Sequence, residues 1–166
     1  MKLKDEKWIK AIPQSQNHGS GILQKKLWRL VSDYCRIRDW YAYEGKCVAT
    51  GAKIGHWRLG QAGHFRPYST CRGMFKFDER NIFLQSPRSN SWGGYDDWIN
   101  FEYNVICRTG NDRKMLDKIN LSFPLKVNDT LVEEKMLDIL SKMKDLPEKP
   151  DYFERVTTLL EALPTT

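Results

Sequence analysis

The chain has 166 residues, a net charge of +6, 40% hydrophobic and 12% aromatic residues. This length and apolar content allow at least one packed core and exclude a disordered polypeptide. No apolar run approaches the roughly 18 residues of a membrane-spanning helix, and the N-terminus lacks the apolar segment of a signal peptide. We therefore expect a protein of the cytoplasm that has no membrane partner.

The charge is unevenly distributed along the chain. Residues 1–90 hold 17 Lys and Arg against 7 Asp and Glu, whereas residues 91–166 hold 10 against 14. This difference can simply reflect two solvated faces. The alternative is a front half that binds a polyanion and a helical back half that packs or recruits a partner.

The first part of the chain alternates between polar and apolar segments. Residues 1–21 are polar and rich in turn formers, which predicts a flexible arm with His18 at the surface. Residues 23–39 have apolar side chains at helical spacing, which predicts an amphipathic helix. Residues 61–67 are typical of a strand entering a turn, and the apolar run 81–85 of a buried strand, with a loop between them.

Helices are predicted for the rest of the chain. Pro87 suits the first turn of a helix that would carry Asn90. Thr130 and Glu133 have the spacing of a capping box. Further helices are expected over residues 95–107, 112–119 and 129–144, and from a cap at Asp151 to about residue 163.

The side chains suited to chemistry lie in the basic half. His64 can take a proton from water near neutral pH, and Asn90 can bind Mg²⁺ or Mn²⁺ through its carbonyl oxygen. Asn81 can position the loop that presents His64. Taken singly, such residues are most often surface, core or turn residues, and their spacing is what favours a function. Basic side chains that can contact DNA phosphates surround them: Arg36, Arg38, Arg58, Arg66, Arg72, Lys76, Arg80 and Arg88.

These residues carry a family resemblance. Gly-His-Phe-Arg-Pro at 63–67, with Asn81 and Asn90, resembles the pattern of the HNH nucleases, which have the ββα-metal or His-Me finger fold. The runs 26–34, 36–39, 61–65 and 77–82 are similar to the phage NinG/Rap recombination endonucleases. The resemblance covers about residues 25–105.

The resemblance implies an α+β fold and an activity. We expect a small ββα-metal core over 22–107, with an N-terminal amphipathic helix, the arm 1–21 before it and a helical C-terminal region over 108–166 after it. The implied activity is metal-dependent cutting of branched DNA, such as Holliday junctions and D-loops, in the cytoplasm of a phage host. His64 would be the general base, Asn81 a positioning residue in the catalytic site and Asn90 the metal ligand.

The sequence departs from this family in three places. One follows Asn90, where family members tend to have a further His and this chain has Ser91-Trp92-Gly93-Gly94. Where the family has two C-x-x-C pairs, this chain has Cys47-Val48-Ala49-Thr50 and Ser86-Pro87-Arg88-Ser89. Because hydroxyls are poor zinc ligands, we expect no structural zinc, with packing and hydrogen bonds joining the two loops. Gly63 stands where many HNH proteins have an acidic metal ligand. Gln61, Asp78 or a water would then complete the metal shell.

Two other functions remain open at this stage. The chain can be a DNA-binding recombination or replication accessory protein that has lost the chemistry, or a module whose acidic C-terminal helices recruit a partner. The apolar faces of residues 131–143 and 153–163 can form a homodimer or fold back on the core.

Overall fold

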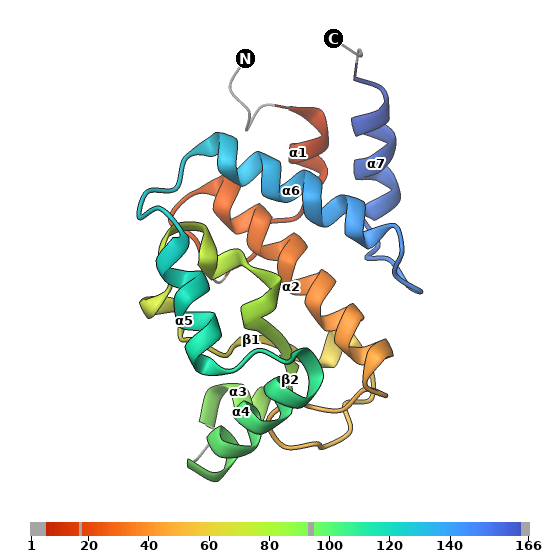
Figure 1. Ribbon diagram of the computed structural model, residues 1–166. Helices are drawn as coiled ribbons and strands as arrows, with labels where there is room; N and C mark the ends of the chain where they lie inside the picture. The colour runs from red at the N-terminus through yellow and green to blue at the C-terminus, as the bar shows by residue number, and fades with distance from the viewer. Residues whose placement is uncertain (1–5, 17, 93–94, 164–166) are drawn as a thin grey trace. The chain divides into compact units, whose positions relative to one another are not determined.

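The computed structural model describes residues 6–16, 18–92 and 95–163. Helices and a small two-stranded antiparallel sheet make up the described part, which confirms the expected mixture of α and β structure (Figure 1). The chain divides into two compact units. We call residues 1–34 with 128–166 the terminal unit, and residues 35–127 the central unit. No helix in the described part is long and apolar enough to cross a membrane.

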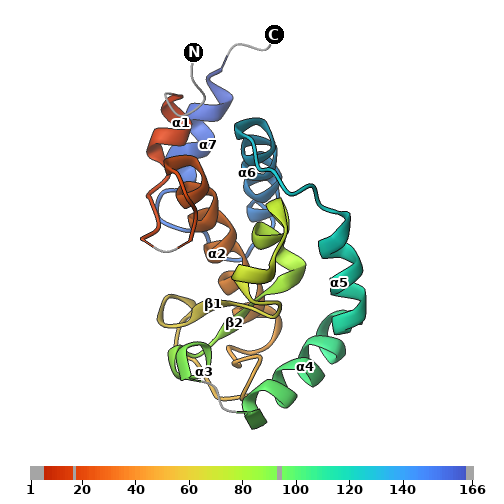
Figure 2. The same cartoon turned by 90° about the vertical axis from the view of Figure 1, so that its left-hand side faces the viewer.

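The terminal unit is helical in its described residues. It contains α1 (Lys7–Ala11), the first part of α2 (Ile22–Ala42), α6 (Asp129–Met143) and α7 (Phe153–Glu161). α1 lies beside α7, as Figures 1 and 2 both show. α1 differs from the flexible arm that the sequence suggested, because Trp8 and Ile9 are buried. Burial of these two side chains compensates the poor intrinsic stability of so short a helix.

The two C-terminal helices are amphipathic, as predicted, and their apolar faces are buried within the fold. α6 begins at Asp129, as predicted, but the N-cap residue of each helix differs from the prediction. The N-cap of α6 is Asn128, whose side chain accepts a hydrogen bond from the Leu131 N–H at 2.9 Å, in place of the expected Thr130. α7 begins at Phe153, after Tyr152 at the N-cap position. The buried side chains are Val132, Met136, Ile139, Leu140, Met143, Phe153, Val156 and Thr157.

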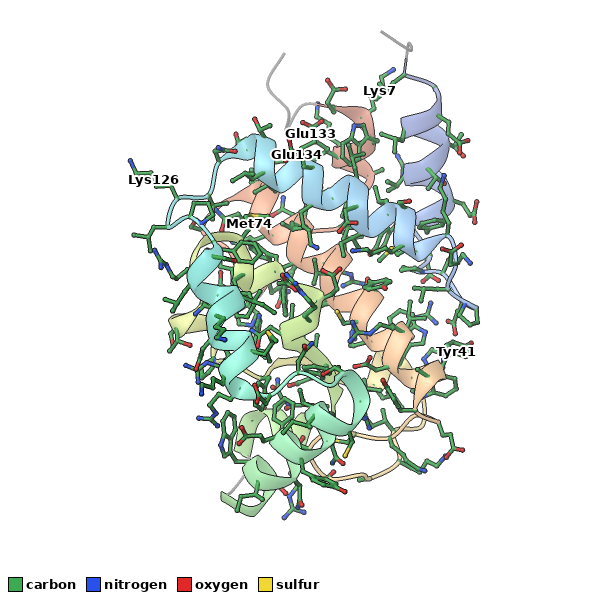
Figure 3. All side chains as sticks on the ribbon, viewed as in Figure 1. Lys7, Tyr41, Met74, Lys126, Glu133 and Glu134 are labelled. Carbon is green, nitrogen blue, oxygen red and sulfur yellow. The ribbon has the colours of Figure 1, made fainter. Side chains whose placement is uncertain are left out.

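Polar contacts also order the terminal unit. Tyr152 donates its hydroxyl to Asp33 at 2.9 Å, and Arg29 forms an ion pair with the same carboxylate at 2.8 Å. Burial, followed by the charge of Asp33, raises the pKa of Tyr152. Figure 3 shows Glu133 and Glu134 on α6, where desolvation and the charges of Glu6 and Glu134 raise the pKa of Glu133.

The central unit holds the sheet. β1 (Gln61–His64) pairs antiparallel with β2 (Ile82–Gln85), so that Gln61 faces Gln85 and His64 faces Ile82. All four residues of β2 are buried, as expected from its apolar run. Short 3₁₀ helices occupy much of the connection between the strands. α3 (Pro87–Trp92), α4 (Tyr95–Thr109) and α5 (Arg113–Ser122) then follow the hairpin.

Aromatic rings pack α4 against the hairpin. The ring of Trp98 stacks on Phe65, the residue after β1, with centroids 5.5 Å apart. Phe101 contacts Phe65 and Phe83 edge to face, at 5.3 and 6.1 Å. Aromatic pairs in these geometries stabilise the fold by more than the burial of their apolar area alone, and they favour defined ring orientations. The first half of α4 is therefore fixed against both strands.

An ion pair at the end of α2 ties this helix to β2. Arg38 contacts Asp39 at 2.7 Å and donates to the backbone oxygens of Glu79 at 3.0 Å and Ile82 at 2.9 Å. Asp39, itself buried, accepts the Leu84 N–H at 2.8 Å. The two charges thus satisfy each other and three backbone groups, which is the condition for burying a pair.

Candidate functional site

His64 closes β1 and lies at the head of the loop to β2. Its Nε2 is 2.8 Å from the backbone oxygen of Lys76, and the edge of its ring meets Tyr68 at a centroid distance of 5.5 Å. Because a carbonyl oxygen only accepts, Nε2 is the donor in this bond. In the neutral ring the lone pair is therefore on Nδ1, which is the form that a general base requires.

Asn81 is fully buried just before β2 and holds the loop after His64. Its Oδ1 accepts the Arg66 N–H at 2.7 Å, and its Nδ2 donates to the Arg66 oxygen at 3.1 Å and to the Cys71 sulfur at 3.4 Å. Its backbone oxygen also accepts the Phe65 N–H at 2.9 Å. Asn81 thus fixes the backbone of the two residues that follow His64.

Asn90 lies on α3, close to the backbone of β1. Its Nδ2 donates to Gln61 Oε1 at 2.8 Å, which sets the orientation of its carboxamide. A Cβ added at Gly63 would lie 2.6 Å from Asn90 Oδ1 and 2.5 Å from the carboxamide carbon of Gln85. Only glycine lets these two side chains approach the strand so closely.

His64 and Asn90 line one cavity of about 240 Å³. The hairpin and α3 therefore bring together two of the three residues that the sequence singled out. Asn81 is not among the described lining residues. Its side chain bonds instead to the backbone of the loop that follows His64. The remaining lining residues are Ala49, Gln85, Ser89, Ser91, Asp97, Trp98 and Phe101.

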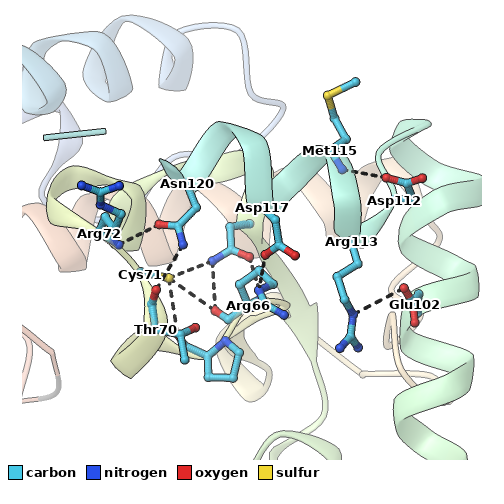
Figure 4. Close-up of polar contacts among 12 residues, drawn as sticks. Arg66, Thr70, Cys71, Arg72, Glu102, Asp112, Arg113, Met115, Asp117 and Asn120 are labelled. Carbon is cyan, nitrogen blue, oxygen red and sulfur yellow. Dashed lines mark hydrogen bonds and ion pairs between the residues drawn. The ribbon is translucent and has the colours of Figure 1, made fainter. Parts of the chain in front are cut away.

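Five of the eight basic residues predicted to contact DNA form hydrogen bonds or ion pairs within the protein. Arg38 belongs to the α2–β2 tie described above. Arg66 pairs with Asp117 of α5 at 2.9 Å (Figure 4). Arg72 donates to the Leu121 oxygen at 3.2 Å. Arg80 contacts Asp78 through two nitrogens, at 2.8 and 2.5 Å. Carboxylates of the protein thus compensate the charges of Arg38, Arg66 and Arg80. That these residues contact DNA stays a prediction.

The fifth is Arg36, which donates to the Gly60 oxygen at 3.2 Å, and the other three basic residues have different surroundings. The guanidinium groups of Arg36 and Arg58 lie 5.2 and 4.6 Å from the Trp57 ring. Lys76 lies 5.4 Å from the Tyr68 ring, and desolvation lowers the pKa of its ammonium group. Arg88 is exposed on α3. It lines a second cavity of about 310 Å³ with Thr50, Ala52, Ser86, Ser89 and Asp97.

The donors around the first cavity suit a hard divalent cation through oxygen. In residues 6–16, 18–92 and 95–163 no group of three or more His, Cys, Asp and Glu is placed to hold a metal ion. The oxygen donors that line the cavity are the carboxamides of Asn90 and Gln85 and the carboxylate of Asp97. Mg²⁺ keeps several waters, so a few protein oxygens suffice.

Two of the ligands suggested from the sequence are already occupied. Asp78 is buried, pairs with Arg80 and accepts the Arg80 N–H at 2.9 Å, so its carboxylate is engaged outside the cavity. Gln61 accepts the Asn90 hydrogen bond and so orients that residue.

Sequence reasoning missed Asp97 and Gln85. The signal that could have found Asp97 is its place four residues before Phe101, which puts the two residues on one face of α4.

The loops 47–50 and 86–89 meet through hydrogen bonds centred on Cys47. Its sulfur lies 3.2 Å from Ser89 Oγ and accepts the Ser86 N–H at 3.2 Å. Burial acts to raise the pKa of this thiol, but hydrogen bonds from Ser89, Thr50 and Ser86 outweigh it and lower the pKa to about 7. Polar groups that are hydrogen-bonded to one another therefore join these two loops beside the cavity.

Comparison with protein-family models, with curated proteins and with solved structures finds no match. The functional argument therefore depends on the geometry of the cavity and on the residues that line it.

Proposed function

We propose that this protein is a metal-dependent, structure-selective DNA endonuclease that acts on branched recombination intermediates such as Holliday junctions and D-loops. One observation carries the proposal: His64 at the end of β1 and Asn90 on the helix after β2 line the same cavity. The resemblance to HNH nucleases, and within them to the phage NinG/Rap proteins, motivates the choice of substrate.

In this proposal His64 is the general base. The Lys76 oxygen holds the proton on Nε2, so Nδ1 accepts a proton from water as the water oxygen bonds to phosphorus. The bond from phosphorus to the leaving oxygen breaks, and that oxygen takes a proton from solvent. A divalent cation, when bound, supplies positive charge to the phosphate and to the leaving oxygen.

The other site residues serve this step by position. Asn81 holds the backbone of Phe65 and Arg66 and so limits movement of His64. Asn90 presents a carboxamide oxygen for the cation, with its orientation fixed by Gln61. Arg88, which is exposed on α3, is the basic residue best placed to contact the phosphate backbone beside the cavity.

The decisive assay is cleavage of a Holliday junction, a D-loop and a linear duplex in Mg²⁺ and in Mn²⁺. We expect cutting of the branched substrates, abolished by EDTA, by His64→Ala and by Asn90→Ala, with DNA binding retained in both variants. A matched control is His56→Asn, which keeps an acceptor for the Arg58 N–H outside the cavity and should retain cleavage. Full activity of His64→Ala, or cutting without metal, would contradict the proposal.

A second function has a specific observation in its favour. Since the described residues hold no cluster of three His, Cys, Asp or Glu for a metal, the chain can be an accessory protein that binds branched DNA without cutting it. In that case the unaltered protein would shift branched DNA in a gel, yet leave it intact at every concentration of Mg²⁺ and Mn²⁺.

A further inference from the structure

We infer that Asp97 is the carboxylate ligand of the proposed cation site, a role that no motif in the sequence assigns to it. The inference rests on the proposed nuclease function and deepens it, because it names the charged ligand that Gly63 cannot supply. Among the described residues that line the first cavity, Asp97 has the one carboxylate. It faces the same space as His64 and Asn90.

The packing of α4 holds Asp97 in this position. Asp97 directly precedes Trp98, whose ring stacks on Phe65, and it lies four residues before Phe101, which contacts both strands. Residues four apart share one face of a helix, so Asp97 and Phe101 face the hairpin together. The helix backbone at Asp97 is thus held against Phe65, the residue that follows His64.

Among the side chains that the structure describes, which do not include those of residues 92–96, none forms a hydrogen bond or an ion pair with the Asp97 carboxylate. Arg88 shares the second cavity with Asp97 but forms no ion pair with it there. Nearby carboxylates behave differently, because Asp78 pairs with Arg80 and Asp117 with Arg66.

The charge of Asp97 also suits the ligand set. Asn90 and Gln85 offer neutral carboxamide oxygens, and a neutral set binds a divalent cation weakly. One carboxylate adds the negative charge that hard cations prefer. Asp97 also lines the second cavity, together with Arg88 and the hydroxyl-bearing residues Thr50, Ser86 and Ser89.

The test measures binding of Mn²⁺ alone, followed by the EPR signal of the free ion. Asp97→Asn keeps the shape of the side chain and should weaken Mn²⁺ binding by at least about tenfold, since loss even of an outer-shell partner costs that much. The matched control is Glu102→Gln, which removes one negative charge from the same helix and only a 3.6 Å ion pair with Arg113. It should bind Mn²⁺ as the unaltered protein does. Equal affinity in Asp97→Asn would overturn the inference.

A second measurement needs no variant. In the unaltered protein, bound Mn²⁺ should broaden the NMR signals of Asp97 and Asn90 far more than those of Glu102, and equal broadening would overturn the assignment. Cleavage of branched DNA, assayed in parallel, separates the two ideas. If Asp97→Asn cuts normally, the nuclease proposal survives without Asp97. If Mn²⁺ binding depends on Asp97 but no DNA is cut, the cation site stands and the nuclease proposal fails.

Discussion

A single buried carboxamide determines where the candidate base lies. Asn81 bonds to both backbone groups of Arg66 and accepts the Phe65 N–H through its own backbone, directly after His64. The role that the sequence suggested for Asn81, holding the loop, agrees with these contacts. Because Asn81 is not among the described residues that line the cavity, we expect it to position His64 rather than to contact a substrate.

We therefore expect Asn81→Ala to act on both stability and cleavage. Removing the side chain leaves the Arg66 N–H and oxygen without partners, which should lower the free energy of unfolding by about 2 kcal/mol. Cleavage should fall in kcat more than in KM, because His64 loses its fixed position while the DNA contacts stay. Urea unfolding and cleavage kinetics measure the two effects.

The control for this variant is Asn128→Ala at the start of α6. It removes an N-cap worth about 1 kcal/mol and should leave cleavage unchanged. If Asn81→Ala retained the cleavage rate of the unaltered protein, the positioning role would be wrong.

Cys47 gives a pH-dependent contribution to stability. Its pKa in the folded protein is about 7, below the ordinary value of 9.0, so the unfolded chain binds more protons between these pH values. Stability should therefore rise from pH 7 to pH 9 and decrease as the pH falls through 7. Urea midpoints at pH 6, 7, 8 and 9 measure this slope.

Cys47→Ala should flatten that rise between pH 7 and pH 9. Cys107→Ala, which removes an exposed thiol, should keep the rise of the unaltered protein. Equal slopes in the two variants would show that the hydrogen bonds of Ser89, Thr50 and Ser86 do not stabilise a Cys47 thiolate.

At the scale of elements, the tie between α2 and β2 holds the hairpin. Arg38→Ala leaves Asp39 as a buried charge without its cation and deprives two backbone oxygens of a donor. We expect a loss of about 3 kcal/mol in the free energy of unfolding, measured by urea denaturation. Arg58→Ala, which removes a contact between the guanidinium and the Trp57 ring, should cost about 1 kcal/mol or less. Similar small losses in both would contradict the structural role of Arg38.

Local patterns predicted most elements, because their signals lie within a few residues. The apolar spacing of 23–39, the buried run before Gln85 and Pro87 at a first helical turn led to α2, β2 and α3 with small errors in their ends. α1 was missed because five residues with two apolar side chains do not form a helix by themselves. Its partner α7 lies far along the sequence.

The candidate site was predictable only in part. The resemblance indicated His64, Asn81 and Asn90. It could not tell which arginines are engaged, because Arg38 finds its partners 41 and 44 residues away. Asp97 was missed for the same reason, since its place at the cavity follows from aromatic packing between α4 and the hairpin.

At the scale of the whole molecule, the terminal unit combines both ends of the chain. A chain that stops after Val127 loses α6 and α7, so Trp8 and Ile9 lose the helix against which α1 packs. We expect the amides of residues 7–11 to lose protection from hydrogen exchange, while β1 and β2 keep theirs. Exchange followed by mass spectrometry measures both.

A chain that stops after Leu163 is the matched control and should protect residues 7–11 as the unaltered protein does. Unchanged protection of these residues in the shorter chain would mean that α1 does not depend on the C-terminal helices.

The split of the terminal unit across the sequence has a consequence for biosynthesis. Residues 35–127 leave the ribosome as one continuous piece and can acquire structure while translation continues. Residues 7–11 are synthesised long before residues 153–161, yet α1 packs against α7. Trp8 and Ile9 therefore lack this packing partner until α7 has left the ribosome.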